Sequence, residues 1–450
     1  MALSANTVWE VRTVGTDTNG GGFVTGASGT DWSQQTAAQY AVTDGVTAGT
    51  TTITSATANF GTDVVGNIMY VAGGTGSVAA DWYQITARTN STTITVDRST
   101  GLTAGTGVTL NIGGALATPG QAAKNATVSG QYIYVKSGTY TITTSTAGAA
   151  GPVLFSSNTS VCMEGYSSTR GDQAARPEMN AGAITSVNLY SSQGNPISQL
   201  FICMAANGNS KTGVSGFEMS SSRVAAINCL ASACDQASAK GFNQTGAVVS
   251  NCKASACTTG FATSSAKAVR SWADACTTGF SDATGSGMTE CVASDCTGDG
   301  FVGANFSMYF GCTADGNTGD GFDLSASVVN FLIGCASTNN GAYGYNTSST
   351  ARAQYLNYCA SYLNTTARAP ANTQIDENQI ILSGDPWTNA ASDDYRPNNT
   401  AGAGASLRGI TAVGVYGQTD NRDVGAVQHT DPAGGGGGVH YTNAMQGNLL

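Results

Sequence analysis

The chain has 450 residues, of which only 10% are charged, and its formal net charge is −10 at pH 7. An ordinary globular protein has about 25% charged residues. Lys and Arg form no cluster, so the basic footprint that nucleic acids and anionic membrane surfaces require is missing. We therefore expect neither a nucleic-acid partner nor a membrane partner.

The composition favours a solenoid over a disordered chain, because 41% of the residues are hydrophobic and they recur at regular intervals. Residues 1–6 contain neither a basic nor an apolar segment, so we expect no secretory signal. No apolar stretch is long enough to cross a membrane. We expect folding in a reducing cytoplasm, where the 12 cysteines are thiols rather than disulfides.

Residues 1–40 are interpreted as a segment that leads into the fold, and residues 41–112 as a small β module. Strand-like runs separated by Gly-rich turns occur in this module at 51–54, 67–71, 82–86 and 93–97. We predict an antiparallel module that caps one end of a solenoid, because a bare end exposes strand edges and core. Residues 113–200 indicate the first, less regular coils, with a strand, a turn and a strand over 131–140.

Residues about 200–365 contain a repeat with three markers. The first marker is Gly followed by an aromatic residue, at Phe217, Phe242, Phe261, Phe280, Phe301, Phe322 and Tyr345. The second lies about 12 residues earlier, at Cys203, Cys229, Cys252, Cys291, Cys312 and Cys335, with Trp272 in that place in one coil and Cys359 at the start of a last coil. The third follows the second after four or five residues, at Cys234, Cys257, Cys276, Cys296, Asn317 and Asn340.

The irregular period of this repeat indicates coils of short β-strands, whose turns tolerate extra residues better than paired helices do. Stacked coils place equivalent residues about 4.8 Å apart, so the aromatic and Cys columns are predicted to run through the interior. Burying each Phe contributes about 1.5–3 kcal/mol. The Gly before each aromatic residue is predicted to occupy a corner with an unusual backbone angle.

Residues about 366–428 lose the repeat. We predict closing coils at 385–387 and 423–427. The run of five glycines at 434–438 is interpreted as a flexible linker. It is followed by a tail, residues 439–450, that we expect to dock on a neighbouring protein; residues 429–450 thus form a separate C-terminal segment.

Taken together, these patterns predict an all-β fold and resemble right-handed parallel β-helix proteins, the pectate-lyase-like class that includes phage tailspikes. The resemblance covers residues 113–428. Residues 385–396 and 423–428 are similar to the terminal segment of many such proteins, and residues 9–12 and 19–23 are similar to the start of β-helix proteins in phage genomes. The class implies a fold but no single activity, since its members include lyases, hydrolases, adhesins and structural parts.

The sequence offers few groups for catalysis or metal binding. His429 and His440 are the two histidines and lie beyond the predicted coils, so a His-based catalytic pair or metal site within the coils is excluded. Pairs such as Cys229 and Cys234 have a spacing that zinc sites tolerate. Their recurrence in every coil favours buried core thiols over a metal site, which needs four ligands once, and over disulfides.

Asp299 and Asp320 each stand two residues before the aromatic marker in adjacent coils. Stacking places them about 4.8 Å apart, near the separation of about 5–5.5 Å between the carboxyls of a retaining glycosidase. The same pair can bind Ca²⁺. Ordinary Asp-Gly turn chemistry is the favoured interpretation, so we assign no catalytic, cofactor or metal residue. The tyrosines considered for stacking on sugars are Tyr309, Tyr343, Tyr355, Tyr358 and Tyr362.

The favoured function is a non-enzymatic structural protein of a phage virion, exposed on the particle as a capsid decoration or as a tail fibre or spike. We expect a homotrimer that assembles in the host cytoplasm and contacts other virion proteins, through residues 439–450 among others. We expect no cofactor, with Ca²⁺ as the alternative. The alternative functions are a tailspike-like polysaccharide lyase or hydrolase and an adhesin, both with host surface polysaccharide as the partner.

Overall fold

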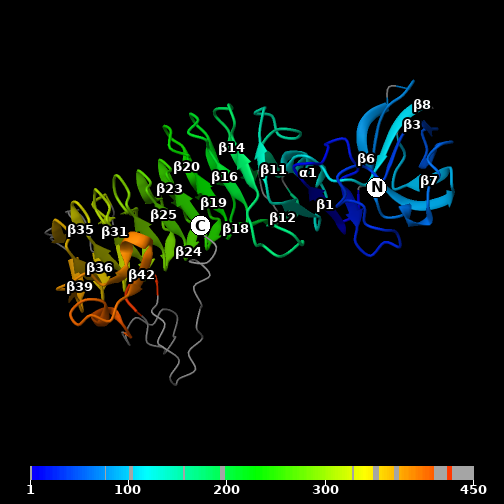
Figure 1. Cartoon of the computed structure of the whole chain (residues 1–450). Coiled ribbons are helices and arrows are strands. Elements are labelled where there is room, and N and C mark those ends of the chain that lie inside the picture. The colour runs from blue at the N-terminus through cyan, green and yellow to red at the C-terminus, as the bar shows by residue number, and fades with distance from the viewer. Residues whose placement is uncertain are drawn as a thin grey trace, which may run out of the picture. The chain divides into compact units, whose positions relative to one another are not determined.

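The computed structural model describes residues 3–76, 78–100, 105–155, 158–192, 198–326, 329–347, 354–368, 374–409 and 423–427. The chain divides into two compact units, Met1–Ala206 (unit 1) and Asn207–Leu450 (unit 2). Both consist mainly of β-strands, and the described residues contain one α-helix, α1 (Pro119–Asn125) (Figure 1). No helix within these ranges is long and apolar enough to span a membrane.

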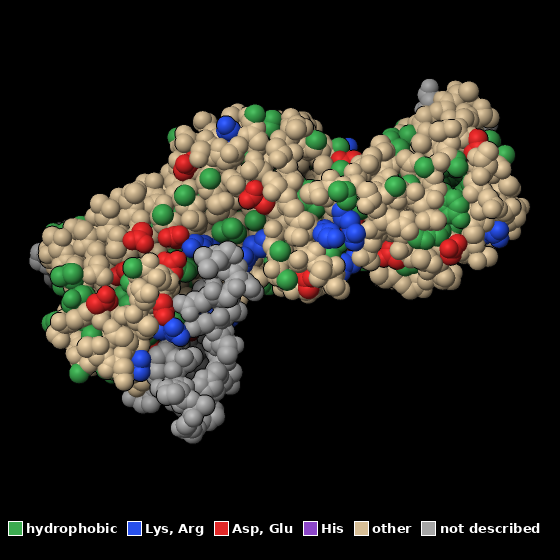
Figure 2. All heavy atoms as spheres, in the orientation of Figure 1, with side chains coloured by type: hydrophobic (Ala, Val, Ile, Leu, Met, Phe, Trp, Pro, Cys, Tyr) green, Lys and Arg blue, Asp and Glu red, His purple; other side chains and the backbone are tan. Residues whose placement is uncertain are grey.

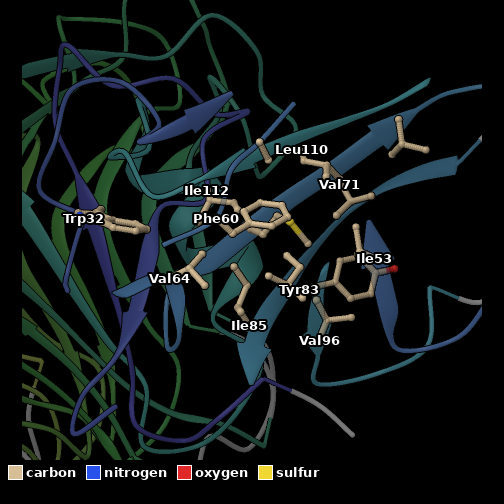
Figure 3. Close-up of a cluster of buried hydrophobic side chains, with 14 of the residues drawn as sticks. Trp32, Ile53, Phe60, Val64, Val71, Tyr83, Ile85, Val96, Leu110 and Ile112 are labelled. Carbon is tan, nitrogen blue, oxygen red and sulfur yellow. The ribbon is translucent and has the colours of Figure 1, made fainter. Parts of the chain in front are cut away.

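Unit 1 contains a closed barrel of six antiparallel strands. In barrel order the strands are β3 (Tyr40–Thr47), β4 (Thr52–Thr54), β7 (Thr93–Val96), β6 (Val78–Asn90), β5 (Ile68–Gly73) and β8 (Gly105–Ile112). Inward side chains such as Ile53, Phe60, Ile85 and Leu110 fill the interior and are fully or almost fully buried (Figure 3). The predicted antiparallel module is confirmed, and closure into a barrel removes its strand edges.

The N-terminal strands of unit 1 belong to the first coils of the solenoid. Strand β1 (Thr7–Val11) pairs antiparallel with β2 (Gly22–Val24) and parallel with β9 (Tyr132–Lys136). Strand β12 (Ser160–Tyr166) pairs with β9 on its other side. The barrel is therefore an insertion in the chain between β2 and β9, and its role as a cap of the solenoid stays a prediction.

The remaining strands of unit 1 and helix α1 complete these first coils. Helix α1 packs against β1, β9 and β11, and six of its seven residues are buried. Two further sheets begin with the parallel pairs β10–β13 and β11–β14, and β12 pairs with β15. The strands are β10 (Thr139–Thr141), β11 (Val153–Phe155), β13 (Glu178–Asn180), β14 (Asn188–Ser192), β15 (Ser198–Ile202) and β16 (Ala205–Asn207).

Unit 2 is a stack of coils whose strands form three parallel sheets. Sheet 1 contains β18 (Val224–Ile227), β21 (Val248–Ser250), β24 (Lys267–Val269), β27 (Gly287–Thr289), β30 (Met308–Phe310), β33 (Asn330–Ile333), β36 (Gln354–Asn357) and β39 (Gln374–Glu377). Sheet 2 contains β19 (Leu230–Ser232), β22 (Lys253–Ser255), β25 (Trp272–Asp274), β28 (Val292–Ser294), β31 (Thr313–Asp315), β34 (Ala336–Thr338), β37 (Ala360–Tyr362) and β40 (Ile380–Ile381). Sheet 3 contains β17 (Ser215–Met219), β20 (Lys240–Thr245), β23 (Thr259–Ser264), β26 (Thr278–Asp282), β29 (Phe301–Val302), β32 (Phe322–Asp323), β35 (Tyr343–Asn346) and β38 (Thr366–Arg368). The predicted parallel β-helix is confirmed.

The predicted aromatic and Cys columns lie inside the solenoid. The rings from Phe217 to Tyr345 stack with centroids 4.6 to 5.2 Å apart and planes within 9° of parallel. All 12 cysteines are free thiols, and all but Cys162 are buried. The third marker continues as an amide ladder in which Asn317 donates to Asn340 and Asn340 to Asn364, both at 2.8 Å.

The prediction that Trp272 occupies the Cys position in one coil is wrong. Trp272 lies opposite Lys253 in the strand register, so Ser271 is the residue aligned with Cys252. Ser271 is fully buried, and its hydroxyl accepts a hydrogen bond from the backbone N–H of Cys252 at 3.3 Å. Because side chains alternate between the faces of a strand, this shift of one residue places Trp272 on the outer face of sheet 2.

The glycines before the aromatic residues are needed for close packing, not for a corner as predicted. Gly279 has ordinary backbone angles, but a Cβ added there would lie 2.5 Å from the carbonyl oxygen of Gly300 in the next coil. The left-handed corner residues instead precede the Cys column, as at Asn251 (φ 53°) and Glu290 (φ 53°). The next coil's backbone therefore excludes a side chain at the Gly marker.

The predicted closing coils at 385–387 and 423–427 do not form. Strands β41 (Trp387–Asn389) and β42 (Asp394–Pro397) pair antiparallel with each other and join none of the three sheets. Residues 385–409 and 423–427, here called the strap, cover the outer face of sheet 2, where Trp387 packs in one cluster with Trp272. The indole Nε1 of Trp387 donates to the Thr338 hydroxyl at 2.9 Å. The glycine linker and the tail 439–450 lie outside the described residues.

Candidate functional site

The two carboxylates considered for catalysis, Asp299 and Asp320, are adjacent but bound to backbone. The Asp299 carboxylate accepts the backbone N–H of Asp320 at 2.7 Å, and the Asp320 carboxylate accepts that of Tyr343 at 2.8 Å. The second Asp320 oxygen accepts the side-chain amide of Asn346 at 2.7 Å. Each carboxylate therefore bonds the next coil, which agrees with the turn interpretation.

Burial raises the pKa of Asp299, and the negative charges of Asp323 and Asp320 add to the effect, while the bond from the Asp320 N–H opposes it. A retaining glycosidase needs one carboxylate free to attack. Both oxygens of Asp320 already accept hydrogen bonds, so this pair is poorly arranged for that reaction. Across the described ranges, no group of three or more His, Cys, Asp or Glu side chains is placed to hold a metal ion.

Of the sequence's histidines and cysteines, the buried thiols of Cys276 and Cys296 are poorly suited to nucleophilic attack. His429 and His440 lie outside the described ranges. Burial is the main cause that raises the pKa of Cys296, and a hydrogen bond with Cys257 is the main cause that raises the pKa of Cys276. Thiols with raised pKa stay protonated near neutral pH and are poor nucleophiles.

A charged network around Glu10 in unit 1 was not predicted from the sequence. The Glu10 side chain is fully buried and accepts hydrogen bonds from Nε of Arg12 and Nε of Arg170, both at 2.7 Å. The Tyr166 hydroxyl also donates to Glu10. Arg170 forms a second ion pair, with Asp31, at 2.9 Å. Burial lowers the pKa of Arg170, but the charges of Glu10 and Asp31 outweigh this effect and raise it.

A second carboxylate, Glu164, lies in the same row of side chains. Glu10, Tyr134 and Glu164 are aligned across β1, β9 and β12, so the Cα atoms of the two Glu residues are about 9–10 Å apart. Glu164 is 4% exposed and accepts the Tyr132 hydroxyl and the Gln173 side-chain amide. A separation of about 6.5–9.5 Å between carboxyls suits an inverting glycosidase, but such carboxylates must reach substrate and water.

The contacts within this network suit a structural role better than a catalytic one. The Arg170 guanidinium lies over the Tyr134 ring, 5.2 Å from its centroid, and so covers that ring. Burial raises the pKa of Tyr132 and of Tyr134, so both hydroxyls stay protonated and neither is a base near neutral pH. Glu10 stands between the apolar residues Trp9 and Val11, and this alternation indicates that the Glu10 side chain points away from the core. The sequence gives no sign of its partner Arg170, which lies 160 residues away in the chain.

A small open pocket of about 170 Å³ lies in unit 1 beside the N-terminal end of α1. Its lining includes the hydroxyl-bearing side chains of Thr13, Thr118, Thr139 and Thr141. Tyr140 is also in the lining, but its hydroxyl already donates to the Lys136 carbonyl at 2.6 Å. The Thr118 hydroxyl is also engaged, because it donates to the Asp17 carboxylate at 2.8 Å and accepts the backbone N–H of Gln121 at 3.3 Å. The pocket therefore offers the hydroxyl groups of Thr13, Thr139 and Thr141 for hydrogen bonds, and its lining includes no charged side chain.

The outer face of sheet 1 in unit 2 exposes apolar side chains on consecutive coils. Met308, Phe331 and Tyr355 are aligned in the register of β30, β33 and β36. Met308 is 39% exposed, Phe331 40%, and Phe306, in the turn before β30, 59%. We call Phe306, Met308, Phe331 and Tyr355 the sheet 1 patch. The strands β30, β33 and β36 contain no charged residue. On the face of the molecule that Figure 2 draws, uncharged polar side chains and backbone make up most of the surface.

The tyrosines considered for sugar stacking have different surroundings. Tyr309 lies in the core, where its ring meets Phe301 edge-on at 5.8 Å. Tyr358 and Tyr362 pack, partly buried, against the cluster beneath the strap. Of the five, Tyr355 belongs to the sheet 1 patch, and its hydroxyl donates to Glu377 at 3.1 Å.

The class that the strand pairing defines is the parallel β-helix proteins, and solved structures with similar folds include enzymes and a viral protein. The pectate lyase Pel9A is 16% identical, with 70% of this chain and 92% of that chain covered and a TM-score of 0.46. The A-module of the Azotobacter vinelandii mannuronan C-5 epimerase AlgE4 is 16% identical, with 62% and 81% covered and a TM-score of 0.41. The protein ORF18 of Geobacillus virus E2 is 11% identical, with 57% and 55% covered and a TM-score of 0.38. No protein-family model and no curated protein matches the chain.

Proposed function

We propose that the chain is a non-enzymatic structural protein of a phage virion, exposed on the particle surface as a capsid decoration or tail fibre or spike. The observation that supports this proposal is the sheet 1 patch, because exposed apolar patches mark protein interaction sites. The repeated markers of the coils hold the solenoid together. The exposed side chains between these markers are therefore available to bind other proteins.

Phe306 is the residue of the patch that packing explains least. Its backbone is left-handed (φ 66°), a conformation that costs a bulky L-residue about 1–2 kcal/mol. Phe306 is 59% exposed, so burial within the chain does not offset this cost. A partner protein that covers the ring accounts for Phe at this position. The docking of residues 439–450 remains a prediction of the same proposal.

The proposal is tested on purified phage particles that contain the wild-type protein or the Phe306→Asp variant. We expect mass spectrometry to find the wild-type protein in washed particles, and immunogold labelling to place it on their surface. We expect Phe306→Asp to lower its amount in particles at least tenfold, whereas Val14→Asp, which changes an exposed valine of unit 1, leaves the amount unchanged. Absence of the wild-type protein from washed particles overturns the proposal.

A second candidate function, binding of host surface polysaccharide, is supported by the hydroxyl-lined pocket of unit 1. Its test is binding of purified host polysaccharide to the wild-type protein and to Thr141→Val, which removes one hydroxyl from the lining. Weaker binding by the variant favours this function. Shortening of the polysaccharide that is lost in Asp299→Asn favours instead the lyase or hydrolase.

A further inference from the structure

We propose that the sheet 1 patch binds a second copy of the same chain, face to face and antiparallel, about a two-fold axis between β30 and β33. This inference rests on the proposed function, names one partner for the patch, and replaces the homotrimer expected from the sequence with a two-chain contact. An antiparallel two-fold contact brings Met308 of one copy opposite Phe331 of the other. The patch then forms the centre of the contact, where the residues that dominate binding cluster.

The charges at the two ends of the face select this arrangement. Lys267 on β24 lies two strands before Met308, and Glu377 on β39 lies two strands after Phe331. An axis between β30 and β33 therefore places β24 of one copy opposite β39 of the other, and Lys267 near Glu377. Both side chains are exposed. A parallel contact instead places Lys267 beside Lys267, and like charges at an interface are unfavourable.

The spacing of the side chains in the sheet 1 patch also fits a second copy of the chain. Met308, Phe331 and Tyr355 are spaced by one coil, about 4.8 Å, and a copy of the same sheet carries side chains with the same spacing. The six overlapping strands span about 24 Å, so the contact belongs among small interfaces rather than those of about 1,600 Å². We therefore expect association in the micromolar range, at about 10 μM and above.

The test measures molar mass by light scattering and sedimentation over a range of concentrations, with the full-length protein. We expect the wild type to shift from one chain to two with rising concentration, and Phe331→Asp to stay at one chain. Leu363→Asp is the matched control, because Leu363 is 71% exposed on the turn after β37. A wild type that stays monomeric at all concentrations, a three-chain mass, or a dimer that persists in Phe331→Asp overturns the inference. Circular dichroism and a melting curve for each variant verify that it is folded.

A charge exchange tests the antiparallel direction separately. Lys267→Glu is expected to weaken dimerisation about tenfold, and the double variant Lys267→Glu, Glu377→Lys is expected to restore it. A double variant that dimerises no better than Lys267→Glu overturns the antiparallel arrangement. Particle composition separates this inference from the proposed function. A monomeric protein found in particles refutes only the self-contact, and a dimer absent from particles refutes only the virion function.

Discussion

The carboxylate of Glu10 and the guanidinium of Arg170 form an ion pair at 2.7 Å although they are 160 residues apart in the chain. Glu10 lies on the first strand of unit 1, and Arg170 lies in the turn after β12. The pair therefore joins the N-terminal strand to a loop of a later coil. This contact, like the strap of unit 2, holds together segments that no local sequence pattern connects.

Replacing Arg170 with Met is expected to destabilise unit 1 by about 3 kcal/mol, because it leaves the buried Glu10 charge with Arg12 as its remaining cationic partner. Urea unfolding measures the change. Arg396→Met is the control: Arg396 pairs with Asp394 but is 32% exposed, and we expect a loss below about 1 kcal/mol. Equal losses for the two variants contradict the structural importance of the Glu10 network.

Asp172 is expected to make the stability of unit 1 depend on pH. The backbone N–H groups of Ser167, Thr169 and Ala174 donate to its carboxylate and hold its pKa well below the ordinary value of about 3.9. A pKa that is lower in the folded state contributes stability above the unfolded pKa, and this contribution is lost as the pH falls through the folded pKa. We expect Asp172→Asn to melt at a lower temperature at pH 7, with a difference that shrinks below about pH 4. A difference that is independent of pH contradicts this assignment.

Trp387→Ala is expected to release the strap while the solenoid stays folded. The substitution removes a buried indole and its bond to Thr338, and such changes cost about 3–5 kcal/mol. Hydrogen exchange measures the effect: we expect amides of residues 385–409 to lose protection and those of β26 to keep it. Asn389→Ala, at an exposed position on the same strand, is the control. Unchanged protection of the strap refutes the role of Trp387.

Gly279→Ala tests the close contact between coils. The new Cβ meets the Gly300 carbonyl oxygen at 2.5 Å, so we expect a loss of about 1–3 kcal/mol in the free energy of unfolding. Gly287→Ala is the matched control, because no atom lies within 4 Å of a Cβ at that position. We expect Gly287→Ala to be neutral or slightly stabilising, since Ala restricts the unfolded chain. If both variants behave alike, the glycines of the repeat are not there for packing.

The sequence predicted the solenoid because its markers recur in register, and the stacked rings from Phe217 to Tyr345 confirm this. It did not predict which face Trp272 occupies, because a shift of one residue reverses the direction of a side chain. The repeat also led to the wrong reason for the glycines before the aromatic residues. Spacing alone does not distinguish a glycine needed for a left-handed backbone from one needed for a close contact with the next coil.

Contacts between residues far apart in the chain could not be predicted from the sequence. The strap was interpreted as closing coils because nothing in 385–427 indicates that Trp387 packs on the outer face of sheet 2. The Glu10 network was missed because Arg170 has no spacing relation to Glu10. The Asp299 and Asp320 pair was placed correctly in adjacent coils, but its backbone partners became visible only in three dimensions.

The proposed virion function is tested most directly by electron cryo-microscopy of particles produced with and without this protein. We predict surface density that accommodates the three-sheet solenoid of unit 2 in the complete particles and is missing in particles that lack the protein. Identical reconstructions of the two particles would contradict the proposed function.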